Sequence, residues 1–197
     1  MHSRTADHPG TDGERRLPEQ IIADASRTVS GVLAKPGTES EAVIKHVLSD
    51  LTNIPATQYN AAYASVLLDC AHFFHLAATP LPGIPICARA VEISRTLNER
   101  PLLRKALTFL GAMHADTGSL PAATTAYAEA MDIAISLDDR FAQAVILNLL
   151  GSLLLSSSQS ADALACFERT TDLAATDDPK ASDSRWRHRR VGRKDAD

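Results

Sequence analysis

The sequence predicts an all-α fold in which helical hairpins stack side by side as an α-solenoid. Apolar residues recur with the helical period of 3.6, and residues of one type recur at a fixed offset of 40 along the chain. Of the 197 residues, 45% are hydrophobic but only 5% are aromatic, and alanine and leucine are abundant through the middle. This composition favours closely packed helices over a β-sandwich or barrel, and it is sufficient for an apolar core.

The first hairpin is expected directly after a polar leader, residues 1–17, which has no apolar stripe. A helix is predicted over 18–33, with a proline near its first position. Pro36 then breaks the chain, and Thr38 or Ser40 can cap a second helix whose apolar residues again follow the helical period. The two helices together make one hairpin.

The next three hairpins are predicted from a comparison of the sequence with itself. The positions that correspond at the offset of 40 are Leu67, Leu107 and Leu147; Cys70, Leu110 and Leu150; Ala71, Gly111 and Gly151; Gly83, Ala123 and Ala163; Cys87, Tyr127 and Phe167; and Ala90, Ala130 and Thr170. Chance rarely produces such agreement. The segment from about Tyr59 to Ala175 is therefore expected to consist of repeated units.

Each unit is expected to contain two helices joined by a short turn. In the clearest unit the first helix is predicted over 101–115, with apolar residues on one face, and it ends near Gly118. Ser119 then begins the second helix. The following unit repeats the pattern over 140–156 and 160–175.

These units resemble the tetratricopeptide repeat, which places Leu-Gly in its first helix and Ala, an aromatic residue and Ala in its second. The positions are filled here by Leu110, Gly111, Ala123, Tyr127 and Ala130, and in the next unit by Leu150, Gly151, Ala163 and Phe167. The small residues let neighbouring helices approach closely, and the aromatic ring fills the groove between them. The period of 40 is similar to the long variants of the family rather than to its usual 34.

The resemblance implies a right-handed superhelix whose first helices line a concave groove, and a protein–protein interaction scaffold that binds a peptide or helix there. The positions that it implies for partner contact are Leu68, His72, His75, Lys105, Thr108, Ala112, Asn148 and Ser152. It implies no enzyme activity. The alternative is a truncated sensory or regulatory N-terminal region of a bacterial signalling protein, of the diguanylate cyclase or transcription regulator type.

The residues themselves predict neither a catalytic site nor a cofactor. No Ser/His/Asp or Cys/His arrangement and no glycine-rich phosphate loop is recognisable, and the cysteines form no CxxC pair. Asp69, His72 and His75 lie three residues apart and could offer a carboxylate and two imidazoles to a metal. Each such step drifts by about 60° around a helix and no fourth ligand is evident, so we predict polar groove-lining or packing residues and no metal.

The charge pattern sets the expectations for partners and compartment. The net charge of -4 creates no field that attracts nucleic acid or membranes, and the leader resembles no secretory signal, so a cytoplasmic protein is expected. The repeat domain is predicted over 18–178, followed by a basic tail, 179–197, that is expected to be disordered. That tail is either an unselected sequence after a truncation or a binding arm. Because it lacks an apolar stripe, we expect self-association through an uncapped C-terminal repeat.

Overall fold

A computed structural model describes residues 16–176 of the chain, so that most of the predicted leader and the whole of the basic tail lie outside the described residues. Every regular element in the described part is helical, which confirms the predicted all-α fold. The elements are α1 (Pro18–Ala34), α2 (Ser40–Thr52), the 3-10 helix η1 (Ala56–Gln58), α3 (Ala61–Leu76), α4 (Pro80–Thr96), α5 (Arg100–Asp116), α6 (Leu120–Ser136), α7 (Arg140–Ser156) and α8 (Ser160–Thr176).

The chain divides into two compact units, residues 1–58 and 59–197. In the first unit α1 and α2 form a hairpin that buries one apolar stripe from each helix, including Val29 and Ile44. Ser40 does not cap α2 in the expected way. It is the first residue of that helix, and its hydroxyl accepts a hydrogen bond of 2.8 Å from the Gly37 amide in the preceding turn.

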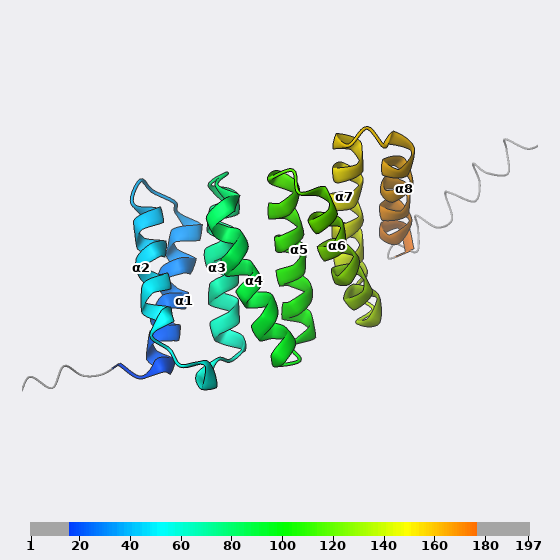
Figure 1. Cartoon of the computed structure of the whole chain (residues 1–197). Coiled ribbons are helices and arrows are strands. Elements are labelled where there is room, and N and C mark those ends of the chain that lie inside the picture. The colour runs from blue at the N-terminus through cyan, green and yellow to red at the C-terminus, as the bar shows by residue number, and fades with distance from the viewer. Residues whose placement is uncertain (1–15, 177–197) are drawn as a thin grey trace, which may run out of the picture. The chain divides into compact units, whose positions relative to one another are not determined.

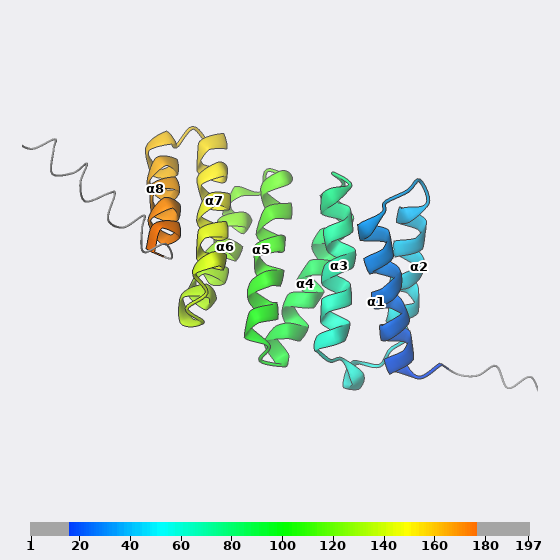
Figure 2. The same cartoon turned by 180° about the vertical axis from the view of Figure 1, so that it is seen from behind.

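The second unit contains three hairpins, α3/α4, α5/α6 and α7/α8, which follow one another in chain order (Figures 1 and 2). The two helices of each hairpin pack along each other, and α4 and α6 also pack against the first helix of the next hairpin. This succession of packed hairpins is an α-solenoid, as the repeated sequence predicted.

The turns within and between these hairpins are built alike. Each contains one residue with a positive φ, and these residues are Ala78, Asn98, Gly118, Asp138 and Ser158, with φ values of 55°, 56°, 75°, 51° and 63°. After each, an amide bonds back to a carbonyl five residues earlier, as in Thr79 to Phe74 at 2.9 Å. This is the hydrogen bond that commonly ends a helix at a left-handed residue. The turns therefore recur every 20 residues, although only one of them uses glycine.

Small residues lie where the paired helices come closest. A Cβ atom on Gly111 would lie 2.6 Å from the Tyr127 ring, and one on Gly151 would lie 2.6 Å from the Phe167 ring. Both distances are shorter than any normal van der Waals contact. In the last two hairpins, the aromatic side chain of the second helix thus packs directly on the backbone of its own first helix.

Candidate partner-binding surface

The first helices of the second unit lie next to one another. Contacts join α3 to α5 and α5 to α7, whereas no comparable contact joins α4 to α6 or α6 to α8 in the described residues. The exposed sides of α3, α5 and α7 therefore form a continuous surface, which we call the first-helix face. It contains His72, His75, Lys105, Thr108, Ala112, Asn148 and Ser152.

The predicted contact residues differ in how far they reach solvent. Lys105, Asn148 and Ser152 are exposed, whereas the two histidines, Thr108 and Ala112 are half-buried. Leu68 is different, because it is 0% exposed and a partner cannot touch it. It belongs to an uninterrupted buried run, 66–68, on a helix that is apolar around most of its circumference. We therefore leave Leu68 out of the first-helix face.

The two histidines of α3 pack against α5 across the repeat boundary. The His72 ring lies 4.7 Å from the Phe109 ring, centroid to centroid, and the His75 ring meets the same Phe109 edge-on at 6.4 Å. Nδ1 of His75 lies 2.9 Å from Oδ2 of Asp116 but makes no aligned hydrogen bond, so the contact is an ion pair when the imidazole is protonated. The histidines thus tie α3 to α5.

The sequence spacing of Asp69, His72 and His75 suggested a possible metal site, which can be compared with the structure. Over residues 16–176, no three His, Cys, Asp or Glu side chains gather closely enough to hold a metal ion. Sequence reasoning missed Phe109 and Asp116, because both contribute from the next repeat. The only available signal was the offset of 40, which places Phe109 in register with Asp69.

Two side chains of this face, His72 and Lys105, determine its charge at neutral pH. Burial lowers the pKa of His72, the nearby His75 and Lys105 lower it further, and Asp69 opposes them. His72 is therefore neutral at pH 7 and can both donate and accept a hydrogen bond. The Arg104 guanidinium lies 3.3 Å from the Asp139 carboxylate, whereas the exposed Lys105 makes no ion pair with another described residue. Lys105 is thus available to a carboxylate of a partner.

Large apolar side chains continue the exposed side of α7. Phe141 is 81% exposed, Val145 is 37% exposed and Leu155 is 55% exposed. They lie at positions i, i+4 and i+14, which share one side of the helix with Asn148 and Ser152. Sequence reasoning missed them because apolar residues lie around most of the circumference of α7, and the pattern alone does not separate core from surface.

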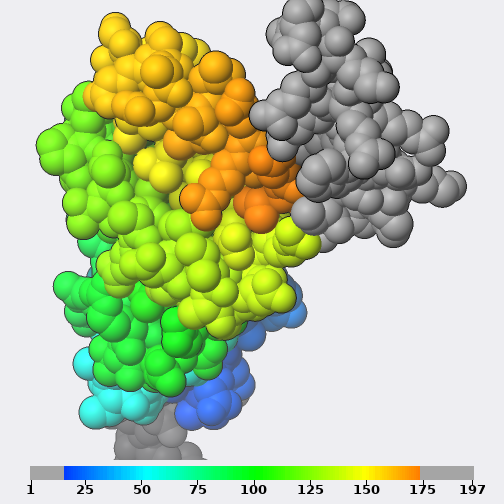
Figure 3. Space-filling view, turned by 90° about the vertical axis from the view of Figure 1, so that its right-hand side faces the viewer, coloured from blue at the N-terminus to red at the C-terminus, as the bar shows by residue number. Residues whose placement is uncertain are grey.

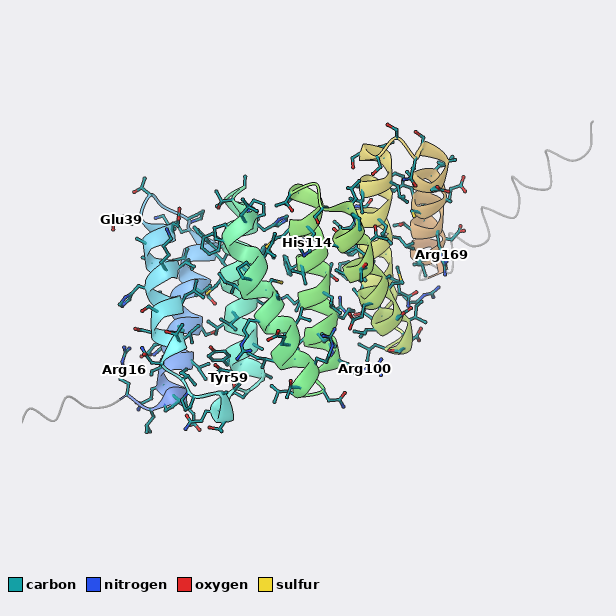
Figure 4. All side chains as sticks on the ribbon, viewed as in Figure 1. Arg16, Glu39, Tyr59, Arg100, His114 and Arg169 are labelled. Atoms are coloured by element: carbon teal, nitrogen blue, oxygen red, sulfur yellow. The ribbon has the colours of Figure 1, made fainter. Side chains whose placement is uncertain are left out.

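Two of the three thiols are buried in the core. Burial raises the pKa of the thiols of Cys70 and Cys87 to about 12, so both stay protonated at neutral pH. The Cys87 thiol donates a hydrogen bond of 3.2 Å to the carbonyl of Ala106. Figure 4 shows His114 on α5, where it is half-buried.

The family comparison agrees with this arrangement of paired helices. Residues 102–176, which cover nearly all of α5 and the whole of α6, α7 and α8, match the family model described as tetratricopeptide repeat. Residues 102–176 thus form tetratricopeptide repeats. Such repeats are in general non-catalytic protein-interaction modules. The match does not distinguish repeat lengths, so the long-period variant of the tetratricopeptide repeat stays a prediction.

Two further findings accompany the match. A comparison with curated proteins finds no match. Among the helices formed by residues 16–176, none combines the length and the apolar character that crossing a lipid bilayer requires.

Proposed function

We propose that this protein is a scaffold that binds a peptide or helix of another protein on its first-helix face. One observation carries the proposal. The contacts from α3 to α5 and from α5 to α7 bring accessible side chains from successive repeats onto one continuous surface. The tetratricopeptide match supports protein binding in general, and we assign that binding to the first-helix face.

The chemistry of the face suits an extended polar segment. Lys105 offers an ammonium group and Asn148 offers an amide that both donates and accepts. The hydroxyls of Thr108 and Ser152 donate hydrogen bonds of 2.9 Å to the carbonyls four residues earlier, and therefore keep acceptor capacity for the amides of a partner. Ala112 lets a main chain come close between them.

The test is charge reversal on the face. The double variant Lys105→Glu with Asn148→Asp should lose captured protein while its far-ultraviolet circular dichroism stays unchanged, because both side chains are exposed. Removing a charge-assisted hydrogen bond costs about 1.5–3 kcal/mol, so we expect a loss of at least about tenfold in affinity. Capture is measured by quantitative mass spectrometry of proteins retained from a lysate.

The matched control is Arg169→Glu with Thr125→Asp. It makes the same change in net charge at exposed positions of α8 and α6, away from the first helices. Proteins retained by the wild type and by the control, but lost by the face variant, support the proposal. If the folded face variant retains the same proteins in the same amounts, binding occurs on another surface.

A further inference from the structure

The three tyrosines of the chain differ in how far they reach solvent. Tyr127 is 1% exposed and Tyr63 is 4% exposed, whereas Tyr59 is half-buried. Tyr59 lies between η1 and α3, directly before Asn60, whose side chain caps α3 by accepting a hydrogen bond of 2.9 Å from the Tyr63 amide. Figure 4 labels Tyr59 at this end of α3. Tyr59 is therefore the tyrosine that a reagent reaches most readily in the folded chain.

Side chains from two helices hold the Tyr59 ring. The Tyr63 ring on α3 stacks on it, with centroids 4.3 Å apart and an angle of 19° between the ring planes. The guanidinium carbon of Arg89 on α4 lies 5.3 Å from the centroid of the Tyr59 ring, within the range of a cation–π interaction. These residues belong to the start of the second unit, whereas Figure 3 looks from the side of the last hairpin, where α8 appears in orange. The ring is thus fixed beside a cation at the beginning of the array.

The charges around Tyr59 favour a negative charge on its oxygen. Residues 51–68, which surround Tyr59 in the sequence, contain no charged side chain. Arg89 therefore supplies the local charge, and that charge is positive. Its other partner is Glu92, whose Oε2 accepts a hydrogen bond of 2.9 Å from Nη1 of Arg89. A cation beside a phenol stabilises the phenolate relative to the neutral form.

The pKa values of the phenols and thiols follow these surroundings. A hydrogen bond with Arg89 lowers the pKa of Tyr59, and burial opposes this effect only in part. Burial raises the pKa of Tyr63 and that of Tyr127 to about 12. Burial also raises the pKa of all three thiols of the chain. Among the tyrosines and cysteines, Tyr59 is therefore the residue whose nucleophilic, anionic form the fold favours.

We propose that Tyr59 is a modification site, at which the phenolic oxygen accepts a phosphoryl group. The oxygen attacks the phosphorus of a phosphoryl donor, and a new O–P bond forms. The bond between phosphorus and the leaving group breaks, and the leaving group departs with the electron pair of that bond. The phenolic proton passes to solvent. Tyr59 is not part of the first-helix face, so the proposal does not depend on the function assigned to that face.

The product suits the same surroundings as the reacting phenolate. A guanidinium group has five N–H donors, and the hydrogen bond to Glu92 uses only one of them. Arg89 can therefore donate to the oxygens of a phosphoryl group on Tyr59, and such charge-assisted hydrogen bonds are strong. The segment 51–68 contributes no carboxylate that would repel the transferred group.

The probe is diisopropyl fluorophosphate, a phosphoryl donor whose leaving group is fluoride. The full chain is treated with this reagent at pH 7.5, and the modified residues are identified and quantified by peptide mass spectrometry. We expect the adduct on Tyr59, whereas Tyr63 and Tyr127 should react only in denaturant. Arg89→Leu should slow the modification of Tyr59 about threefold, the modest effect expected of a partly exposed charge, and Arg89→Lys should restore most of the rate.

The matched control is Arg95→Leu, on the same helix α4. The Arg95 side chain is 53% exposed and pairs with Glu129, so its loss should leave the rate of Tyr59 modification unchanged. The dependence of that rate on pH separates activation by Arg89 from a structural role. Because the phenolate is the reacting form, Arg89→Leu should move the rate profile to higher pH while the far-ultraviolet circular dichroism stays unchanged.

Three results would overturn the proposal. The first is a native chain that gives no adduct on Tyr59, or one in which the adduct is confined to lysines. The second is modification of Tyr63 in the native chain as fast as that of Tyr59. The third is a folded Arg89→Leu protein that reacts at the wild-type rate with an unmoved pH profile, because Arg89 would then not activate the phenol.

Discussion

Gly111 and Gly151 occupy equivalent sites, but alanine should cost very different free energies of unfolding at the two. A Cβ at either site would lie 2.6 Å from an aromatic carbon, so in both cases the ring must move. Tyr127, which faces Gly111, is 1% exposed and enclosed, whereas Phe167, which faces Gly151, is half-buried and can shift toward solvent. The difference lies in the freedom of the neighbouring ring.

The expected magnitudes follow from two opposing terms. Replacing glycine by alanine inside a helix gains about 0.8–1 kcal/mol at both sites. Overpacking a well-packed contact costs about 1–3 kcal/mol, and we assign the upper part of that range to Gly111 and the lower part to Gly151. Gly111→Ala should therefore lose about 1–2 kcal/mol, while Gly151→Ala should stay within about 0.5 kcal/mol of the wild type.

Urea denaturation followed by circular dichroism measures both values. Tyr127→Leu provides a double-mutant cycle, because the smaller side chain should remove most of the penalty of Gly111→Ala. Equal losses at the two glycines, or a gain in stability for Gly111→Ala, would refute the reasoning. The larger replacement Gly151→Leu should still destabilise the protein, by about 1–3 kcal/mol.

Three further predictions concern other parts of the second unit. Ala78→Gly and Ser158→Gly should each stabilise the chain by about 1 kcal/mol, because φ is 55° and 63° there and glycine tolerates such angles; thermal melts with no upward shift would contradict this. The second prediction concerns His72, whose pKa is lowered by burial. Because the unfolded chain binds a proton at this residue more readily than the folded chain, the free energy of unfolding should fall as the pH drops from 7.5 through the ordinary histidine range, near 6.5. Urea denaturation at pH 7.5 and 5.5 should show a smaller loss of unfolding free energy for His72→Gln than for the wild type. An identical loss in the two proteins would show that His72 does not cause the pH dependence. Finally, the native chain should expose one thiol to a disulfide reagent, the half-buried Cys166, with Cys70 and Cys87 reacting only in denaturant; three thiols reacting in the native state would show that the buried pair is accessible.

The helices were predictable because their evidence is local. Apolar periodicity, breaks and caps predicted a helix over 101–115, and the structure has Arg100–Asp116; the predictions over 18–33 and 140–156 are equally close to Pro18–Ala34 and Arg140–Ser156. The turns were harder, because the left-handed residues Ala78 and Ser158 have no preference that reveals them.

The candidate site was less predictable because it depends on contacts between repeats. The register located Lys105, Asn148 and Ser152 on an accessible side, but it could not show that Leu68 is buried. It also could not show that Phe109 packs against both histidines, since these contacts join residues more than thirty positions apart in the chain. Periodicity identifies the face of a helix, whereas the neighbours of that face come from the fold.

The even spacing of the turns has a consequence for how such an array changes in length. Because positive-φ turns recur every 20 residues, from Ala78 to Ser158, two crossover points 40 residues apart fall at the same place in equivalent turns. Recombination there would add or remove one hairpin while the Gly111 and Tyr127 type of contact is preserved within each hairpin. A crossover 20 residues apart would instead exchange first helices for second helices, and Met131 would then stand in register with Gly111 and Gly151. The number of hairpins can therefore change by one whole hairpin at a time. Each change adds or removes exposed side chains while the packing of the remaining hairpins is kept.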